Sequence, residues 1–544
     1  MYPRWLWPLS ALPGVVWLLI LFLLPLYAVV AVAFGGVDPV LLQPIPAWNP
    51  ADWNTASVTH VLHELAPGGI FWDVALRTCE YVALALAGCI LIGYPVAYYV
   101  ARHASRTKSL LLILLVLPFW ISYLMRMLAW INMLSPGGFG LRFLSDTGIS
   151  AALYHLGVIS DPTNYLGGQS FTVILALIYG YIPYFILPLY ASLDRIDRSH
   201  LEAARDLGAS PFRAFWHVTL PLSKTGLLGG AVLITLPMFG DYFTPNIVSG
   251  APTTSMIGNQ WGRPRFLVLV TWGYIVWSIV PVLIAIQFSF NNSRSLSVWH
   301  GFTLKWYTST DPNIDSVFHS AELLGALEQS MKLAALDVLI AVPIGVFLAL
   351  GLARWRGRGS GASNFLMLFP LVTPEIVAGV SLLLLFSQLL TFVPFGTNAQ
   401  VLGHVTFSIS FVVVIVRGRL FSIGPSYEEA AADLGAAPAT RLYRVLLPLL
   451  LPAIVASAAI VFAISIDDFV LSQWLSNGAN STTVPMEIYA ATRATPEPST
   501  DGIATVIMVI TLLTVVAGVL VYRVFTRGES GRGSAVDDVA GFGI

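Results

Sequence analysis

The fold of this chain is decided by a stretch of sequence that occurs twice. Residues 202–211 read Glu-Ala-Ala-Arg-Asp-Leu-Gly-Ala-Ser-Pro, and residues 429–438 read Glu-Ala-Ala-Ala-Asp-Leu-Gly-Ala-Ala-Pro. Each copy is followed by a Leu-Pro pair, at 220–221 and at 447–448. With a shift of 227 positions, 12 of the 21 residues in 202–222 are identical. A repeat that keeps both its spacing and its chemistry indicates a duplicated module.

The repeated stretch predicts a short helix, a tight turn and a second short helix. Its first part permits a helix, and the glycine that follows, Gly208 or Gly435, suits the left-handed residue that ends one. Pro211 and Pro438 suit the first turn of the next helix, and Ser210 is the expected N-cap of the first copy. One face of that second helix would carry Phe212, Phe215, Trp216 and Thr219. Such a face either lies on the bilayer surface or docks on another protein, and its duplication favours docking.

Composition predicts an all-α, polytopic membrane protein. Of the 544 residues, 56% are hydrophobic and 10% are charged, whereas soluble proteins average about 25% charged residues. The two cysteines, Cys79 and Cys89, share one apolar segment, where packing is a simpler role than redox or metal chemistry. The sequence contains no Gly-x-x-x-x-Gly-Lys-Ser/Thr motif, so it offers no phosphate-binding loop of that kind.

Eleven segments are apolar enough to span a bilayer. Lys and Arg cluster around both repeats and after the last segment, while residues 35–74 contain neither and carry three tryptophans. The positive-inside rule therefore places both repeats and the C-terminus in the cytoplasm. The Gly- and Ser-rich residues 528–544 are expected to form a disordered cytoplasmic tail. The eleven segments lie at about 12–34, 75–101, 109–133, 169–193, 223–247, 266–290, 328–353, 363–390, 401–421, 449–475 and 503–525.

The number of segments conflicts with this topology. Two repeats on the same side of a membrane must be separated by an even number of crossings, yet five segments lie between them. Either one segment is re-entrant, or a helix is missing where two ancestral halves join, within residues 222–300.

The paired Glu-Ala-Ala loops resemble the coupling loops of bacterial ABC importer permeases. Residues 1–261 resemble one permease subunit of the spermidine/putrescine importers, through 117–130 and through Leu-Pro-Met-Phe-Gly-Asp-Tyr-Phe at 236–243. Residues 267–525 resemble its partner subunit, through Phe-Ser-Phe-Asn-Asn at 288–292 and Ser-Ile-Asp-Asp-Phe at 465–469. The resemblance implies two fused homologous halves of the type I ABC importer permease fold, with about 11 to 12 transmembrane helices. The halves would be 1–264, with coupling loop 196–222, and 265–527, with coupling loop 423–449.

The resemblance also implies the partners. Each loop would seat in a groove of a separate ATPase subunit, which binds the ATP and magnesium, so this chain would be a transport subunit that binds no cofactor. An extracytoplasmic binding protein would deliver polyamine, which then crosses the plasma membrane of a bacterium by alternating access. The lipid bilayer is the expected surrounding, and no nucleic acid is expected as a partner. The coupling residues would be Glu202, Ala203, Ala204, Gly208 and Pro221 in the first loop, and Glu429, Ala430, Ala431, Gly435 and Pro448 in the second.

Charged residues at membrane depth are candidates for the substrate pathway. Carboxylates would offset the lost hydration of a polycation, and aromatic faces would add cation–π contacts. The alternative, without a role in transport, is that these residues lie at span ends in water or pair with one another. Arg126 has the wrong sign for a polyamine, so we expect an internal ion pair or a carbonyl of a kinked helix as its partner. The histidines show no metal-binding pattern. The candidates are Asp241, Tyr242, Glu375, Asp467, Asp468 and Trp120.

Other functions remain open at this point. The same class of permease carries ferric iron, thiamine or phosphonate, and an anion carrier should show basic pathway residues. An ion-coupled secondary transporter would explain duplicated halves, but it gives no reason for two Glu-Ala-Ala loops. A membrane enzyme would need a catalytic cluster, and the sequence offers none.

Overall fold

The computed structural model describes most of the chain. Two candidate pathway residues, Trp120 and Tyr242, lie outside the described residues, as does the expected tail at 528–544. Helices dominate what is described, which confirms the all-α prediction; two short strands, β1 (Gly36–Val37) and β2 (Pro44–Ile45), pair antiparallel. The described residues are Pro3 and 5–37, 44–104, 108–116, 123–135, 137–166, 169–241, 265–296, 298–311, 313–424, 426–493 and 497–526.

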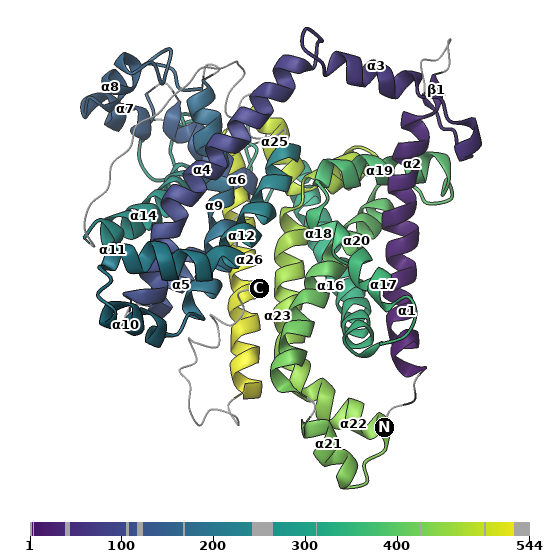
Figure 1. The fold of residues 1–544 in the computed structure, drawn as a ribbon. Coiled ribbons are helices and arrows are strands. Elements are labelled where there is room, and N and C mark those ends of the chain that lie inside the picture. Colours follow the sequence, from purple (N-terminus) through teal and green to yellow (C-terminus); the bar gives the residue numbers. More distant parts are fainter. Residues whose placement is uncertain are drawn as a thin grey trace.

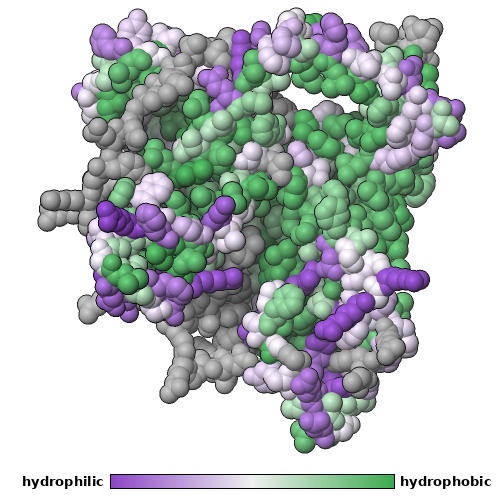
Figure 2. Space-filling view, in the orientation of Figure 1, coloured by the Kyte–Doolittle hydropathy of each residue, from purple (hydrophilic) through white to green (hydrophobic). Residues whose placement is uncertain are grey.

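The helices follow the apolar segments of the sequence. Among the described residues, nine helices are long and apolar enough to cross a membrane, and one bent pair makes a tenth. The segment expected at 109–133 contributes α5 (Lys108–Val116) and α6 (Tyr123–Leu134), which flank residues outside the described ranges. Apolar side chains gather over the middle of the face drawn in Figure 2, and hydrophilic ones lie mainly above and below them.

The two halves repeat the same order of elements. A shift of 227 positions carries both ends of α12 onto those of α23, and the start of α9 onto that of α20. The first half contains α4 (Trp72–Arg102), α5, α6, α9 (Ser170–Asp194), α10 (Arg198–Asp206), α11 (Pro211–Ala214) and α12 (Leu220–Gly240). The second contains α16 (Ala321–Arg354), α17 (Ser360–Leu366), α18 (Phe369–Val372), α19 (Glu375–Gln388), α20 (Thr397–Ile423), α21 (Ser426–Asp433), α22 (Pro438–Arg441), α23 (Leu447–Asp467), α24 (Val470–Trp474), α25 (Val484–Arg493) and α26 (Pro498–Thr526).

A proline break bends one span of the second half. The pair α17–α18 meets α19 at an angle of 109°. Pro374 stands at this break as the N-cap of α19, and proline has no backbone N–H to continue the preceding helix. The break lies against the end of α12, where a Cβ added to Gly240 would lie 2.6 Å from the Cβ of Pro374. Glu375, the first residue of α19, is thereby placed where the two halves meet.

Each half is covered by a helix that comes before the other half in the sequence. The N-terminal span, made of α1 (Leu6–Leu18), η1 (Leu19–Leu23) and α2 (Leu24–Ala33), packs on α16 and α19 of the second half. It is the purple helix on the right of Figure 1, beside the green helices. In turn α14 (Arg265–Phe288), which precedes the second half, packs on α4 and α6 of the first. The two covering spans are thus exchanged between the halves.

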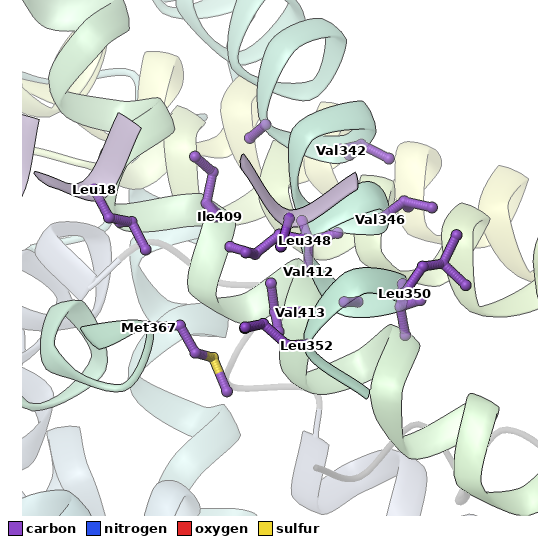
Figure 3. Close-up of a cluster of buried hydrophobic side chains, with 14 of the residues drawn as sticks. Leu18, Val342, Val346, Leu348, Leu350, Leu352, Met367, Ile409, Val412 and Val413 are labelled. Atoms are coloured by element: carbon purple, nitrogen blue, oxygen red, sulfur yellow. The ribbon is translucent and has the colours of Figure 1, made fainter. Parts of the chain in front are cut away.

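Small residues let the N-terminal span approach α16 closely. A Cβ added to Gly351 would lie 2.6 Å from the Cβ of Ala11, and one added to Gly14 would lie 2.8 Å from Leu348. Figure 3 shows Leu18 of this span near Ile409 and Leu348 in a buried apolar cluster of the second half. Because lipid is as apolar as the helix surfaces, close packing of this kind holds membrane helices together.

The direction of α14 bears on the conflict in the number of crossings. Helix α12 starts at the first coupling loop, and α14 ends beside Tyr307, whose ring lies near Gly502 at the start of α26. In Figure 1 the start of α26 lies at the top with α3 (Ala56–Glu64), α7 (Phe139–Asp146) and α8 (Ile149–His155), whereas α10, α11, α21 and α22 lie below. Consecutive described helices α12 and α14 therefore run in the same direction, and both repeats lie on one side.

The described contacts of α12 and α23 differ between the halves. Helix α26 packs along α23, but among the described residues no helix packs along α12 in the corresponding way. Helix α14, which is next among the described helices, instead takes the covering position on the first half. Helix α14 is long and apolar enough to cross a membrane by itself, and residues 242–264, which connect α12 to it, lie outside the described residues.

Candidate functional site

The two repeats form closely matched loops. Gly208 and Gly435 have φ angles of 80° and 81°, the left-handed conformation that glycine adopts without strain. The residue after each glycine donates its backbone N–H back to the helix, from Ala209 to the carbonyl of Ala204 and from Ala436 to that of Ala431, at 3.0 Å in both loops. This is the helix ending that the sequence predicted.

Most of the residues named as coupling candidates are exposed in both loops, and the second alanine of each motif, Ala204 or Ala431, is half-buried. Glu202 and Glu429 are exposed, and so are the alanine that follows each of them and the prolines Pro221 and Pro448. Leu207 and Leu434, which precede the two glycines, each keep 90% of their surface exposed. Exposed leucines in matched positions at one end of the molecule are typical of a surface that binds another protein.

The second short helix differs from the prediction. It does not stand alone: α11 continues through the π-helical turn η4 (Phe215–Thr219) into α12, and α22 continues through η5 (Leu442–Leu446) into α23. The expected apolar face is therefore divided. Phe215 turns inward and packs edge-on against Tyr94 and Tyr98, whereas Phe212 and Trp216 stay exposed. A π turn widens the helix by one residue and shifts side chains around its axis, which an ideal helical projection does not capture.

An arginine at the end of a span holds each loop. Arg354 at the end of α16 binds both carboxylate oxygens of Glu428, which is buried, and lies over the ring of Trp7. In the first half, Arg102 at the end of α4 donates to the carbonyl of Ile196 at 2.6 Å. Sequence reasoning missed these residues, because their partners lie 74 and 94 positions away.

Carboxylates from both halves come together at the ends of α12 and α23. Tyr123, the first residue of α6, joins them: its backbone N–H donates to Asp467 at 2.9 Å and its hydroxyl donates to Asp241 at 2.8 Å. Tyr181 donates a second hydrogen bond to Asp241 at 3.2 Å. Charge-assisted bonds of this kind fix the position of an ionised carboxylate.

Two further acids belong to the same cluster. Glu375 lies close enough to interact electrostatically with Asp241, Asp467 and Asp468, and it remains exposed. Asp468 is more enclosed and accepts a hydrogen bond from the backbone N–H of Ser472 at 3.0 Å. The structure thus brings together all four predicted acids. Neither Tyr123 nor Tyr181 was named from the sequence, since a tyrosine in an apolar span carries no distinguishing signal.

Arg126 supplies a fixed positive charge beside this cluster. Arg126 is 2% exposed, and its guanidinium donates to the carbonyl of Gly180 at 3.4 Å and lies 5.4 Å from the centre of the Tyr123 ring. A carbonyl near Pro183 in α9 is the kind of partner expected for it from the sequence. Its sign excludes it as a direct ligand of a cation.

The arrangement has no feature of a metal centre. Within the described residues, no group of three or more His, Cys, Asp or Glu side chains has the geometry to hold a metal ion. The acids instead lie where the two halves meet, so their negative charge is distributed over several separate groups beside tyrosine hydroxyls. Such a distribution suits an extended organic cation.

The membrane domain is helical and duplicated. It carries matched exposed loops on one side and a polar cluster between its halves. These features together define the membrane component of a transporter. The chain belongs to the family of binding-protein-dependent transport system inner membrane components, whose model matches residues 90–296 and 341–530. It is therefore a multi-pass permease of the bacterial inner membrane, with two permease modules in one polypeptide, and not an enzyme.

Its curated relatives each match about half of the chain. The spermidine/putrescine transport system permease protein PotC of Escherichia coli (strain K12) is 34% identical over 252 residues, which are 46% of this chain and 92% of PotC. The putrescine transport system permease protein PotI of the same strain is 32% identical over 45% of this chain and 86% of its own length. The spermidine/putrescine permease protein PotB is 33% identical over 38% of this chain and 70% of its own length. These matches confirm the resemblance found in the sequence.

Proposed function

We propose that this chain forms the membrane domain of an ABC importer for polyamines such as spermidine and putrescine. The observation that carries the proposal is the cluster of Asp241, Glu375, Asp467 and Asp468 between the halves. A polyamine that leaves water loses the hydration of several ammonium groups, and carboxylates at membrane depth offset that loss. The names of the relatives PotB, PotC and PotI support the same cargo.

Other cargoes fit the cluster less well. Phosphonate would meet four carboxylates of its own sign, which disfavours its entry. Ferric iron would call for a compact set of ligands, and the described residues contain none with that geometry. Thiamine is a cation, but its single fixed charge cannot pair with several separated carboxylates at once. A secondary transporter would leave the two exposed loops without a role.

We further propose that each loop docks on one ATPase subunit, which binds ATP and magnesium, and that an extracytoplasmic binding protein delivers the polyamine. Glu202, Glu429 and the exposed Leu207 and Leu434 would form the contacts. Closure of the two ATPase subunits would move both loops together, and with them α12 and α23, whose last turns precede Asp241 and Asp468. Alternating access to the carboxylates would follow from this motion.

The test is uptake of radiolabelled spermidine by proteoliposomes that contain this chain, the candidate ATPase and the binding protein. Asp241→Asn with Asp467→Asn keeps the shape of both side chains but removes two charges, and we expect at least about a tenfold loss of uptake. Asp52→Asn, an exposed acid on the outer side, is the control and should transport normally. Uptake that survives the loss of both charges would overturn the polyamine assignment.

A further inference from the structure

Helix α6 of the first half turns one of its faces toward its own half. Met127, Trp130 and Leu134 recur at the spacing of three and four residues that marks one side of a helix. All three are buried, in a cluster of the first half that includes Tyr165 and Tyr179. This face fixes α6 to the half to which it belongs.

The opposite face of α6 is buried against the second half. Met125, Leu128 and Ala129 have no exposed surface, and they share a cluster with Ile503 of α26. Together with Asn132 they lie on the other side of a helix that has about 3.6 residues per turn. We call this face, made of Met125, Leu128, Ala129 and Asn132, the seam, because it joins the first half to the second.

The seam ends in a buried polar pair. The side-chain Nδ2 of Asn132 donates to both carboxyl oxygens of Asp501, at 3.2 Å and 3.1 Å. Asn132 is 2% exposed, and Asp501 has no exposed surface. Asn132 lies in the last turn of α6 and Asp501 in the first turn of α26, which starts on the outer side. These hydrogen bonds therefore join the two halves at the outer ends of their helices.

The start of α6 is also bonded to the second half. The backbone N–H of Tyr123 donates to Asp467 in the acid cluster, as described above. Nine residues separate Tyr123 from Asn132, which corresponds to about 14 Å along the helix axis. The seam between these two points is apolar. It therefore separates the acid cluster from the outer side while the halves are together.

A buried polar pair responds to water differently from an apolar contact. While the halves are together, the amide of Asn132 and the carboxyl of Asp501 satisfy each other. When the halves part on the outer side, water hydrates both groups, whereas apolar side chains would be exposed at a cost. A seam that ends in a polar pair therefore opens more easily than one that is apolar throughout. It also closes well only when both partners are present, because either one alone would be buried without a hydrogen bond.

We propose that Asn132 and Asp501 form a latch that sets the balance between the closed and the open state of the outer side, and that α6 is the element that separates from the second half when the latch opens. Both are positioning residues, which act on the placement of the two halves and not on the cargo. The proposal rests on transport by alternating access, as proposed above, but it does not rest on the identity of the substrate.

The test compares single and combined changes of the latch. Asn132→Val leaves the buried carboxyl without its donor, and Asp501→Ala leaves the buried amide without its acceptor, so each should favour the open outer side. The double change Asn132→Val with Asp501→Ala leaves neither polar side chain in the closed seam, so it should hold the outer side closed at least as well as the wild type. Asp501→Asn keeps an acceptor for the Asn132 amide and should behave as the wild type.

The opening is measured as the distance between two spin labels on the full chain in nanodiscs. Cys79 of α4 is exposed and Cys89 is buried, so one label attaches to the native Cys79. The other attaches to Glu322→Cys, at an exposed position in the first turn of α16. We expect the fraction of molecules with the longer distance to rise about fivefold or more in each single variant, and to return to the wild-type value or below it in the double variant.

Thr397→Val is the matched control. It removes a hydrogen bond of 2.9 Å from the buried Gln329, and both residues belong to the second half. We therefore expect a lower midpoint of thermal unfolding with no change in the label distance. Unchanged distances in the two single variants would overturn the proposal, and so would a double variant that opens as the single variants do.

The label distances require neither polyamine nor ATPase, so they separate the possible failures. If the distances change as expected but the assembled wild type takes up no spermidine, the polyamine function fails and the latch stands. If the wild type takes up spermidine but the single variants leave the distances unchanged, the function stands and the latch fails.

Discussion

Arg354 binds Glu428 through both of its terminal guanidinium nitrogens, and this pair joins the end of α16 to the second coupling loop. The carboxylate of Glu428 is buried, so the pair is shielded from water more than an ordinary surface ion pair. A force applied to α21 is therefore transmitted directly to a membrane span.

Replacing Glu428 with Gln should weaken this connection. The change leaves Arg354 facing a neutral group in a largely buried place, which costs about 3 kcal/mol when an ion pair loses one charge. We expect a lower midpoint of thermal unfolding, and ATP hydrolysis that no longer rises on addition of loaded binding protein. Glu429→Gln, next to it but exposed, should leave the unfolding midpoint unchanged. Equal midpoints for all three proteins would contradict the prediction.

The double change Glu202→Ala with Glu429→Ala should prevent docking of the ATPase. Both carboxylates are exposed in matched loops, so their removal should leave the fold intact while it removes one polar contact from each interface. Co-purification with the ATPase measures the effect, and the retained unfolding midpoint shows that the loops persist. Undiminished recovery of two ATPase subunits would refute the assigned role.

Tyr123→Phe should impair substrate affinity without disturbing the fold. The change removes the hydroxyl that donates to Asp241 but keeps the ring and the backbone N–H that donates to Asp467. A hydrogen bond to a charged group contributes about 1.5 to 3 kcal/mol, so we expect a rise in the KM for spermidine of about tenfold or more. Tyr27→Phe, far from the cluster on α2, should show no such rise.

Gly351→Leu should separate the N-terminal span from α16. The new side chain would collide with Ala11 across a contact that has no room for even a Cβ, and overpacking of this kind costs about 1 to 3 kcal/mol. Gly418→Leu, on the neighbouring helix α20, meets open space and should be tolerated. The midpoint of thermal unfolding in nanodiscs compares the two, and the prediction fails if Gly418→Leu is the more damaging change.

Stability should fall as the pH rises toward neutrality because of Glu487 in α25, on the outer side. Burial, and then the nearby Glu322, raise the pKa of Glu487 from its ordinary value of 4.5 to about 7. Between these values the unfolded chain releases the proton while the folded chain keeps it, so unfolding becomes more favourable with increasing pH. Above about pH 7 both states are ionised and the effect levels off. Glu487→Gln should flatten the pH dependence of the unfolding midpoint between pH 4.5 and about 7; an unchanged slope would contradict this.

The sequence contained enough to predict the architecture and the acids but not their partners. The repeat and the apolar segments predicted the helices and both loops, because these features are local. Asp241, Glu375, Asp467 and Asp468 were recognisable because a charge inside an apolar span is unusual. Tyr123 and His404 were not, because their contacts with Asp467 and Asp468 join residues 344 and 64 positions apart in side chains that are common in helices. The sequence did not predict that Phe215 packs inward while Phe212 stays exposed, because no local sequence signal reveals a π turn.

The exchange of covering helices has a consequence for biogenesis. In a permease made from separate subunits, each half must find its partner by diffusion in the membrane, and their expression levels must be balanced. Here the span that covers the second half precedes both halves in the chain, and the span that covers the first half emerges from the ribosome before the second half is made. A single polypeptide fixes the ratio of the halves at one to one. The two halves then associate within one molecule, so their association does not depend on how many copies the cell contains.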